Sequence, residues 1–143
     1  MVVRVKIKVS AGGRFVEAPA LANSGYESET PQLMVPVRVA EELGLWPPGR
    51  EFIESNFETA GGPLRVWILE RACTVKVVSD VESPEVVADL VVSLLTDEIL
   101  ISDKLISELG IALEDVGRGL WRFRWEDRDK VRYSVPPKYW RIP

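Results

Sequence analysis

The sequence predicts a mainly β protein with two short helices and an internal repeat. Runs rich in Val, Ile, Phe, Trp and Thr recur along the chain, and several alternate apolar and polar residues with the period of a strand. Glycine-containing turns separate these runs, and two short segments end in Glu-Leu-Gly, which is typical of a helix C-terminus. The length of 143 residues, 46% of them hydrophobic, is enough for one domain with a real core.

The first part of the chain predicts a strand pair, a loop and a helix. Residues 2–9 ("VVRVKIKV") and 15–22 are expected to be antiparallel strands, because the "SAGGR" turn between them holds two adjacent glycines. The second strand is expected to end at "ANSG", residues 22–25. A helix is predicted over about 36–43, because Pro36 suits a first helical turn and Gly44 suits the residue beyond a helix end.

The second part predicts a hairpin, two more strands and a second helix. Residues 51–59 and 64–78 flank "AGGP", which indicates a hairpin with a glycine at its tip. A Pro-containing loop is expected near 82–85. Strands are then expected through "VVADLVVSLL" (86–95) and at "ILIS" (99–102), followed by a helix over about 103–109 that ends at Gly110.

The segment 118–143 differs in charge from the rest of the chain. It holds eight Lys or Arg against three Asp or Glu, so it carries +5 while the preceding part carries −9 of the overall −4. Aromatic residues lie between the basic ones, a pattern found in nucleic-acid-binding segments. An overall acidic protein repels phosphate, so we interpret the segment as a strand and an extended tail packed on the barrel or a dimer interface, and nucleic acid as an unlikely partner.

The composition excludes several kinds of chemistry. The chain has no histidine and one cysteine, Cys73, so we expect no zinc or other metal site, no cofactor, and no Ser-His-Asp or Cys-His catalysis. Acid–base chemistry must then depend on carboxylates, lysines or tyrosines. No apolar run reaches the ~18 residues that would suggest a membrane span, so we expect a cytoplasmic protein without membrane contact.

Two segments of the sequence align without gaps at an offset of 66 residues. They are "LMVPVRVAEELGL" (33–45) and "ILISDKLISELGI" (99–111), and both run from three apolar residues to Glu-Leu-Gly-apolar. Glycine capping alone could produce a shared ending. The match in apolar pattern over thirteen positions favours an internal duplication, with repeats at about 1–50 and 66–115.

The order of these features resembles that of the retropepsin-like aspartic proteases. In that family the first repeat carries Asp-Thr/Ser-Gly after a strand, and the second carries a glycine-containing apolar stretch before a helix. Here "LANSG" (21–25) and "ILISDKL" (99–105) occupy these places. The resemblance covers roughly residues 1–115 and implies a small closed β-barrel over 1–117, with 118–143 as an extension.

The resemblance also implies a site and a partner. One catalytic loop per chain implies a homodimer, with two loops meeting at the two-fold axis and a hairpin at about 54–67 closing over an extended peptide or unfolded protein. The implied loop residues are Asn23 in the Asp position, Ser24 and Gly25. The implied substrate-binding residues are Ala60, Gly61, Gly62 and Ser102, where Ser102 replaces the usual glycine.

Asn23 argues against catalysis. A pair of Asp side chains shares one proton, so that one acts as base and the other as acid, and each such group is typically worth ~10²–10⁴-fold in rate. Asn keeps the size and hydrogen bonding of Asp but has no proton to exchange near neutral pH. We therefore expect an inactive endopeptidase homologue, or a peptide- or protein-binding dimer that uses the same cleft. A deliberate Asp→Asn change, a natural loss and partial deamidation remain alternative origins of Asn23.

No other carboxylate replaces the missing Asp convincingly. Asp89 lies 66 residues after Asn23, but no Ser/Thr-Gly follows it, and we interpret it as a strand residue that faces solvent. Asp103 is expected at a helix start with Ser102 as the N-cap. Glu27 and Glu29 follow the loop and could line a cleft, although surface glutamates usually have no special role.

Overall fold

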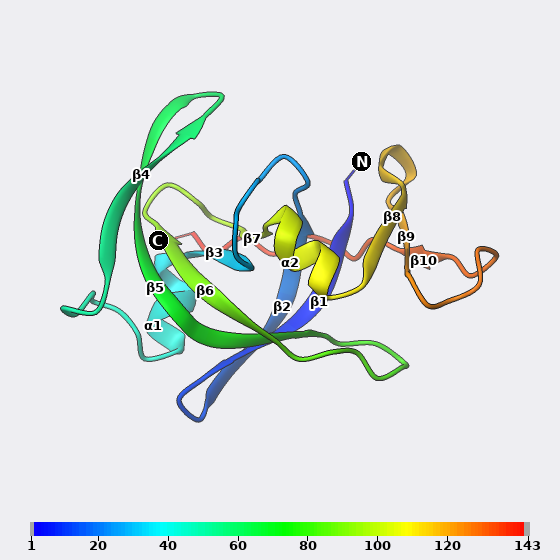
Figure 1. Ribbon diagram of the computed structural model, residues 1–143, viewed down its shortest axis with the longest axis horizontal. Coiled ribbons are helices and arrows are strands. Elements are labelled where there is room, and N and C mark those ends of the chain that lie inside the picture. Colours follow the sequence, from blue (N-terminus) through cyan, green and yellow to red (C-terminus); the bar gives the residue numbers. More distant parts are fainter. Residues whose placement is uncertain (1, 142–143) are drawn as a thin grey trace.

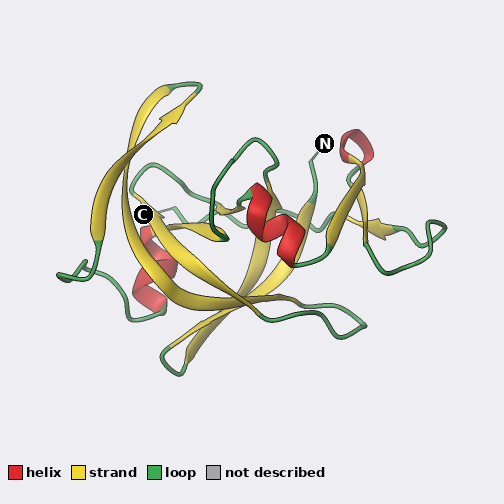
Figure 2. Ribbon diagram, in the orientation of Figure 1, coloured by secondary structure: helices red, strands yellow, loops and turns green. Residues whose placement is uncertain are grey.

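A computed structural model describes residues 2–141 and shows ten β-strands with two short α-helices and one 3₁₀ turn (Figures 1 and 2). The elements are β1 (Arg4–Ala11), β2 (Arg14–Ala22), β3 (Gln32–Pro36), α1 (Val37–Glu42), β4 (Ile53–Thr59), β5 (Gly62–Val77), β6 (Val86–Ser93), β7 (Ile99–Ile101), α2 (Asp103–Glu108), β8 (Ile111–Asp115), η1 (Val116–Arg118), β9 (Leu120–Phe123) and β10 (Arg132–Tyr133). Among the described residues no helix has the length and apolar character needed to cross a membrane.

Six of the strands form a closed barrel. They follow the order β1-β2-β7-β3-β6-β5, and β5 pairs with β1 to complete the circuit. β4 pairs with β5 alone, so the β4–β5 hairpin extends from the barrel, as Figure 1 shows. The predictions of a mainly β fold, a closed barrel and two short helices are confirmed.

The barrel is filled by the alternating residues that predicted its strands. In β1, Val5, Ile7 and Val9 are at most 1% exposed, while the residues between them lie on the outer face. β1 continues into β2 through Gly12 and Gly13, whose φ values of 54° and 84° lie in the left-handed region that glycine adopts without strain. This first hairpin is therefore a direct consequence of its local sequence.

β7 lies between two strands that are consecutive in the chain, β2 and β3. It runs parallel to β2 and antiparallel to β3, with Leu21 opposite Leu100 and Met34 also opposite Leu100. Because β7 separates β2 from β3, residues 23–31 must cross from one side of β7 to the other. The strand β3 was not predicted, since the sequence analysis placed only a helix in this region.

The long strand β5 serves both the barrel and the hairpin. Its first half pairs with β4 and its second half with β1, while β6 pairs with both halves. A register shift between Leu69 and Cys73 bends the strand, and Arg71 within it has a φ of 51°, which is uncommon for a residue other than glycine. The bend lets β5 pair with β4 through its first half and with β1 through its second half.

Residues 118–141 of the C-terminal segment pack on the barrel. β8, β9 and β10 form a small separate sheet, and Trp121, Phe123 and Trp140 are at most 6% exposed within the main core cluster. From β10 the chain runs behind the barrel to the far end of the molecule, where Arg38 of α1 donates a hydrogen bond to the Arg141 carbonyl (Figure 1).

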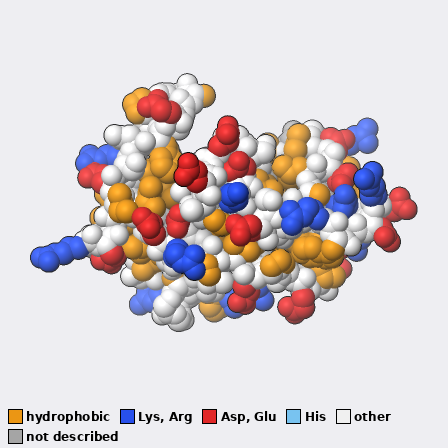
Figure 3. Space-filling model, viewed as in Figure 1, with side chains coloured by type: hydrophobic (Ala, Val, Ile, Leu, Met, Phe, Trp, Pro, Cys, Tyr) orange, Lys and Arg blue, Asp and Glu red, His pale blue; other side chains and the backbone are white. Residues whose placement is uncertain are grey.

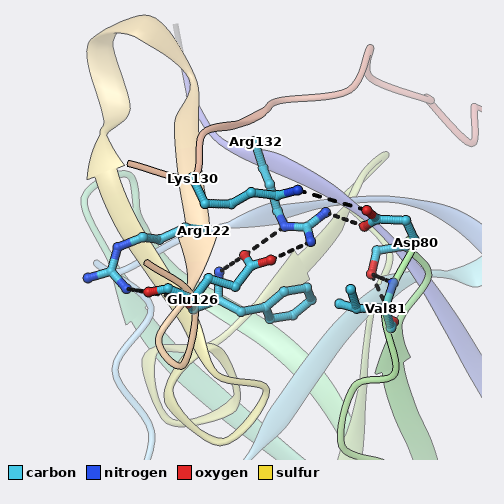
Figure 4. A network of polar contacts seen from close by, with 8 residues as sticks. Asp80, Val81, Arg122, Glu126, Lys130 and Arg132 are labelled. Atoms are coloured by element: carbon cyan, nitrogen blue, oxygen red, sulfur yellow. Dashed lines mark hydrogen bonds and ion pairs between the residues drawn. The ribbon is translucent and has the colours of Figure 1, made fainter. Parts of the chain in front are cut away.

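An ion-pair network holds residues 126–132 of this segment in place (Figure 4). Arg132 donates to both carboxylate oxygens of Glu126, at 2.9 and 2.6 Å, and to Asp80 at 2.7 Å. The hydrogen bonds from Arg132 lower the pKa of Glu126 and of Asp80, and they raise the pKa of Arg132. The network joins the tail to the loop between β5 and β6.

Candidate functional site

The loop that follows β2 is held in a defined turn by Asn23. The Asn23 N–H donates to the Ile101 carbonyl of β7, and the Asn23 carbonyl accepts from the Tyr26 N–H. Its side-chain Oδ1 accepts from the Gly25 N–H at 3.1 Å. An Asn or an Asp side chain can make this last bond equally well, so an Asp at position 23 would keep the turn.

Ser102 supports the far end of the same loop. It is fully buried, and its Oγ accepts from the N–H groups of Gln32 (3.1 Å) and Leu105 (3.3 Å). The second bond makes it the N-cap of α2, and Asp103 follows in the first turn, so this part of the prediction is confirmed. Its predicted contact with substrate finds no support in this position, because the hydroxyl is enclosed by backbone.

A cavity of about 1190 Å³ opens between this loop and the β4–β5 hairpin. One wall is the loop from Asn23 to Pro31, and the other is the hairpin, including Phe57 and Ala60. Three of the predicted site residues lie on its lining, namely Asn23, Gly25 and Ala60. Four others do not, namely Ser24, Gly61, Gly62 and Ser102.

The floor of the cavity is a second, smaller apolar cluster outside the barrel core. Met34, Val66 and Val91 form its buried centre. Five half-buried side chains pack against them: Tyr26, Phe57, Leu64, Ile68 and Leu100. Tyr26 and Phe57 lie with ring centroids 6.2 Å apart, so the loop and the hairpin are in contact through aromatic side chains.

Asp89 corrects one of the predictions. It does not face solvent but is 7% exposed, and its carboxylate accepts from Thr30 Oγ1 at 2.6 Å and from the Arg71 N–H at 2.8 Å. It thus joins the end of the Asn23 loop to the strained bulge in β5. The only sequence signal for this role was a charged residue within the apolar run "VVADLVV".

Burial keeps two titratable side chains neutral, namely Tyr26 on the cavity lining and Cys73 in the barrel core. Burial raises the pKa of the Tyr26 phenol, and the nearby Asp89 charge adds to the effect. Burial likewise raises the pKa of Cys73 to about 12, and the thiol is 4% exposed, in agreement with its interpretation as an inert core residue. Within residues 2–141, no three His, Cys, Asp or Glu side chains gather in a way that could hold a metal ion.

Comparisons with known proteins leave the family open. No protein-family model matches the chain. No curated protein matches it either. The residues and geometry of the cavity are therefore the evidence for function.

Proposed function

We propose that the protein is a homologue of the retropepsin-like aspartic proteases that binds extended peptides as a homodimer and does not hydrolyse them. The observation that carries the proposal is Asn23. It begins the turn after β2 and lines the cavity, and in the sequence it occupies the position that the resemblance assigns to the catalytic Asp. An amide there can position a peptide by hydrogen bonding, but it cannot act as the base or acid of hydrolysis.

The pairing of the two halves supports the family assignment. The helices α1 and α2 begin and end 66 residues apart, at the offset of the sequence repeat. β3 and β7 pair antiparallel, with Met34 opposite Leu100. β1 and β5 also pair antiparallel, with Val9 opposite Val75. Each of these pairs joins two residues at the same offset of 66, as expected when an internal two-fold axis relates the halves.

The cavity and the hairpin support an extended ligand. The cavity runs beneath a hairpin whose strand β4 pairs only with β5 among the described residues, so one edge of β4 has free backbone groups. Such an edge suits recognition of an extended chain. The chain holds a single loop of the Asn-Ser-Gly type, and a site built from two such loops requires a second copy.

The proposal is tested by restoring the carboxylate. We expect the protein as it stands to bind extended peptides and to leave an unfolded protein substrate uncleaved between about pH 3 and 7. Asn23→Asp should cleave the substrate with an acidic optimum, because the paired carboxylates then share a proton. Asn56→Asp is the matched control, since Asn56 lines the same cavity outside the loop and should gain no activity.

The outcomes separate the parts of the proposal. Sedimentation analysis should show a dimer for all three proteins. Cleavage by the unaltered protein would contradict the claim that it is hydrolytically silent. A folded monomer that neither binds peptide nor cleaves as Asn23→Asp would overturn the proposal as a whole.

A further inference from the structure

The cavity is lined by far more acid than base. Among residues 2–141, six carboxylate residues contribute to its walls against a single basic residue, Arg71. We call them the cavity carboxylates: Glu27, Glu29, Glu58, Glu70, Asp89 and Asp103. They come from the Asn23 loop, the hairpin, β5, β6 and the start of α2, so acid surrounds the apolar floor on several sides.

The cavity carboxylates differ from many other acids of the protein in having no cationic partner in the part of the chain that the structure describes. Within residues 2–141, eight Asp or Glu residues form ion pairs with Lys or Arg, and none of them lines the cavity. Asp89 and Asp103 accept hydrogen bonds from uncharged groups of the protein. Glu27, Glu29 and Glu58 are exposed on the two facing walls, where their charges are free to meet a ligand.

We propose that the cavity selects extended peptides in which Lys or Arg flanks an apolar residue. This inference rests on the proposed peptide-binding function and specifies its ligand. The apolar side chain would lie on the floor formed around Met34, while the flanking cations would meet glutamates of the loop and of the hairpin. Figure 3 shows carboxylates around apolar surface at the base of the hairpin, which is the pattern that such a ligand complements.

The test uses three fluorescein-labelled ten-residue peptides with one apolar centre, flanked by Lys, by Gln or by Glu. Fluorescence anisotropy gives the Kd of each with the full-length protein at low and at high salt. We expect the Lys peptide to bind roughly tenfold or more tighter than the Glu peptide, because several exposed charge contacts each contribute a small factor. The difference should shrink at high salt, which screens exposed charges.

Two sets of variants test whether the cavity carboxylates cause the preference for the Lys peptide. The triple variant Glu27→Gln, Glu29→Gln and Glu58→Gln should lose most of the preference for Lys. The matched control is Glu82→Gln, Glu85→Gln and Glu108→Gln, which removes the same charge from exposed positions outside the cavity and should change the Kd by less than about twofold. Phe57→Ala should weaken all peptides that bind, whatever their charge, because it removes part of the apolar wall.

Each result has a distinct meaning. Equal binding of the three peptides, weakened by Phe57→Ala, would overturn the charge selection and leave the proposed function standing. Absence of binding by any peptide would overturn both. A preference for Lys that both triple variants reduce equally would reflect the overall negative charge and would also overturn the selection by the cavity.

Discussion

Two loops of the barrel occupy corresponding places and differ in what they present. Residues 23–31 follow β2, which pairs in parallel with β7, and residues 94–98 follow β6, which pairs in parallel with β3. Leu21 faces Leu100 in the first pair and Val91 faces Met34 in the second. Two residues after Leu21 the chain reaches Asn23, the first residue of the first loop. Two residues after Val91 it reaches Ser93, the last residue of β6 before the second loop.

The two loops differ at this position, and we call the first loop open and the second closed because Asn23 reaches the cavity and Ser93 does not. Asn23 is half-buried and lines the cavity, whereas Ser93 is fully buried and its Oγ accepts from the Leu95 N–H. The C-terminal segment is bonded to the second loop at Asp97, whose carbonyl accepts from the Trp140 N–H and whose carboxylate pairs with Arg141 at 3.1 Å, while Leu94 and Leu95 of this loop are exposed. At this corresponding position one chain therefore presents Asn23 alone to the cavity, although Thr96 of the second loop also lines it.

The largest change in the free energy of unfolding is expected when Asp replaces Ser93. The same replacement at Asn23 is the comparison. Ser93→Asp should lower the free energy of unfolding by about 3–5 kcal/mol, because it buries a charge without a partner. Asn23→Asp should change it by less than about 1 kcal/mol, because the new carboxylate keeps the bond to Gly25 and reaches solvent. Urea denaturation at neutral pH measures both values.

Ser93→Ala provides the control for the loss of the hydroxyl alone, which should cost less than the introduction of a charge. If Ser93→Asp were tolerated as well as Asn23→Asp, the second loop would be able to open, and the contrast between the two loops would fail.

The sequence predicted the elements whose signals are local. The first hairpin depends on adjacent glycines, and both helices were placed to within one residue at each end by Pro36, Gly44 and Gly110. β3 was missed because its five residues precede a helix directly and gain their strand pairing from β6 and β7, which come more than fifty residues later.

The cavity was predictable in part. Asn23 and the hairpin were identified from glycine and strand patterns, and the structure places both on the same cavity. The burial of Asp89 was not predictable, because its partners Thr30 and Arg71 come from other segments of the chain. The enclosure of Ser102 likewise depends on Gln32, 70 residues earlier in the chain.

A smaller change in the free energy of unfolding is expected at Ser102, which supports the open loop. Ser102→Ala should lower the free energy of unfolding by about 1–3 kcal/mol, because the buried N–H groups of Gln32 and Leu105 would lose their acceptor. The same change at Ser107, which is exposed on α2, removes only one bond from Arg124 and should cost little. Equal losses for the two variants, measured by urea denaturation, would show that Ser102 does not support the loop.

The smallest change in the free energy of unfolding tests the C-terminal segment, which is bonded to the closed loop at Asp97. The pKa of Glu126 is lowered in the folded protein, chiefly because Arg132 donates hydrogen bonds to it. The lowered pKa means that the ionised carboxylate stabilises the fold above the ordinary glutamate pKa of about 4.3, and that this contribution is lost as the pH falls through the folded value. Glu126→Gln should therefore lower the free energy of unfolding at pH 6 by no more than about 1 kcal/mol.

Below the folded pKa of Glu126 the difference between the two proteins should vanish, because both then carry an uncharged side chain at this position. Urea denaturation from pH 6 to pH 3 measures this convergence, and Glu82→Gln, which changes an exposed glutamate outside the network, should follow the unaltered protein throughout.

Hydrogen exchange at the Trp140 amide, which bonds to the closed loop, compares the two loops directly. If acid loosens the tail, the protection factor of the Trp140 amide, in which the pH dependence of the intrinsic exchange rate is removed, should fall in the range where the two proteins converge, while that of the Gly25 amide of the open loop should show no such step. A step of equal size at both amides would mean that the tail stabilises the whole barrel and does not close one loop selectively.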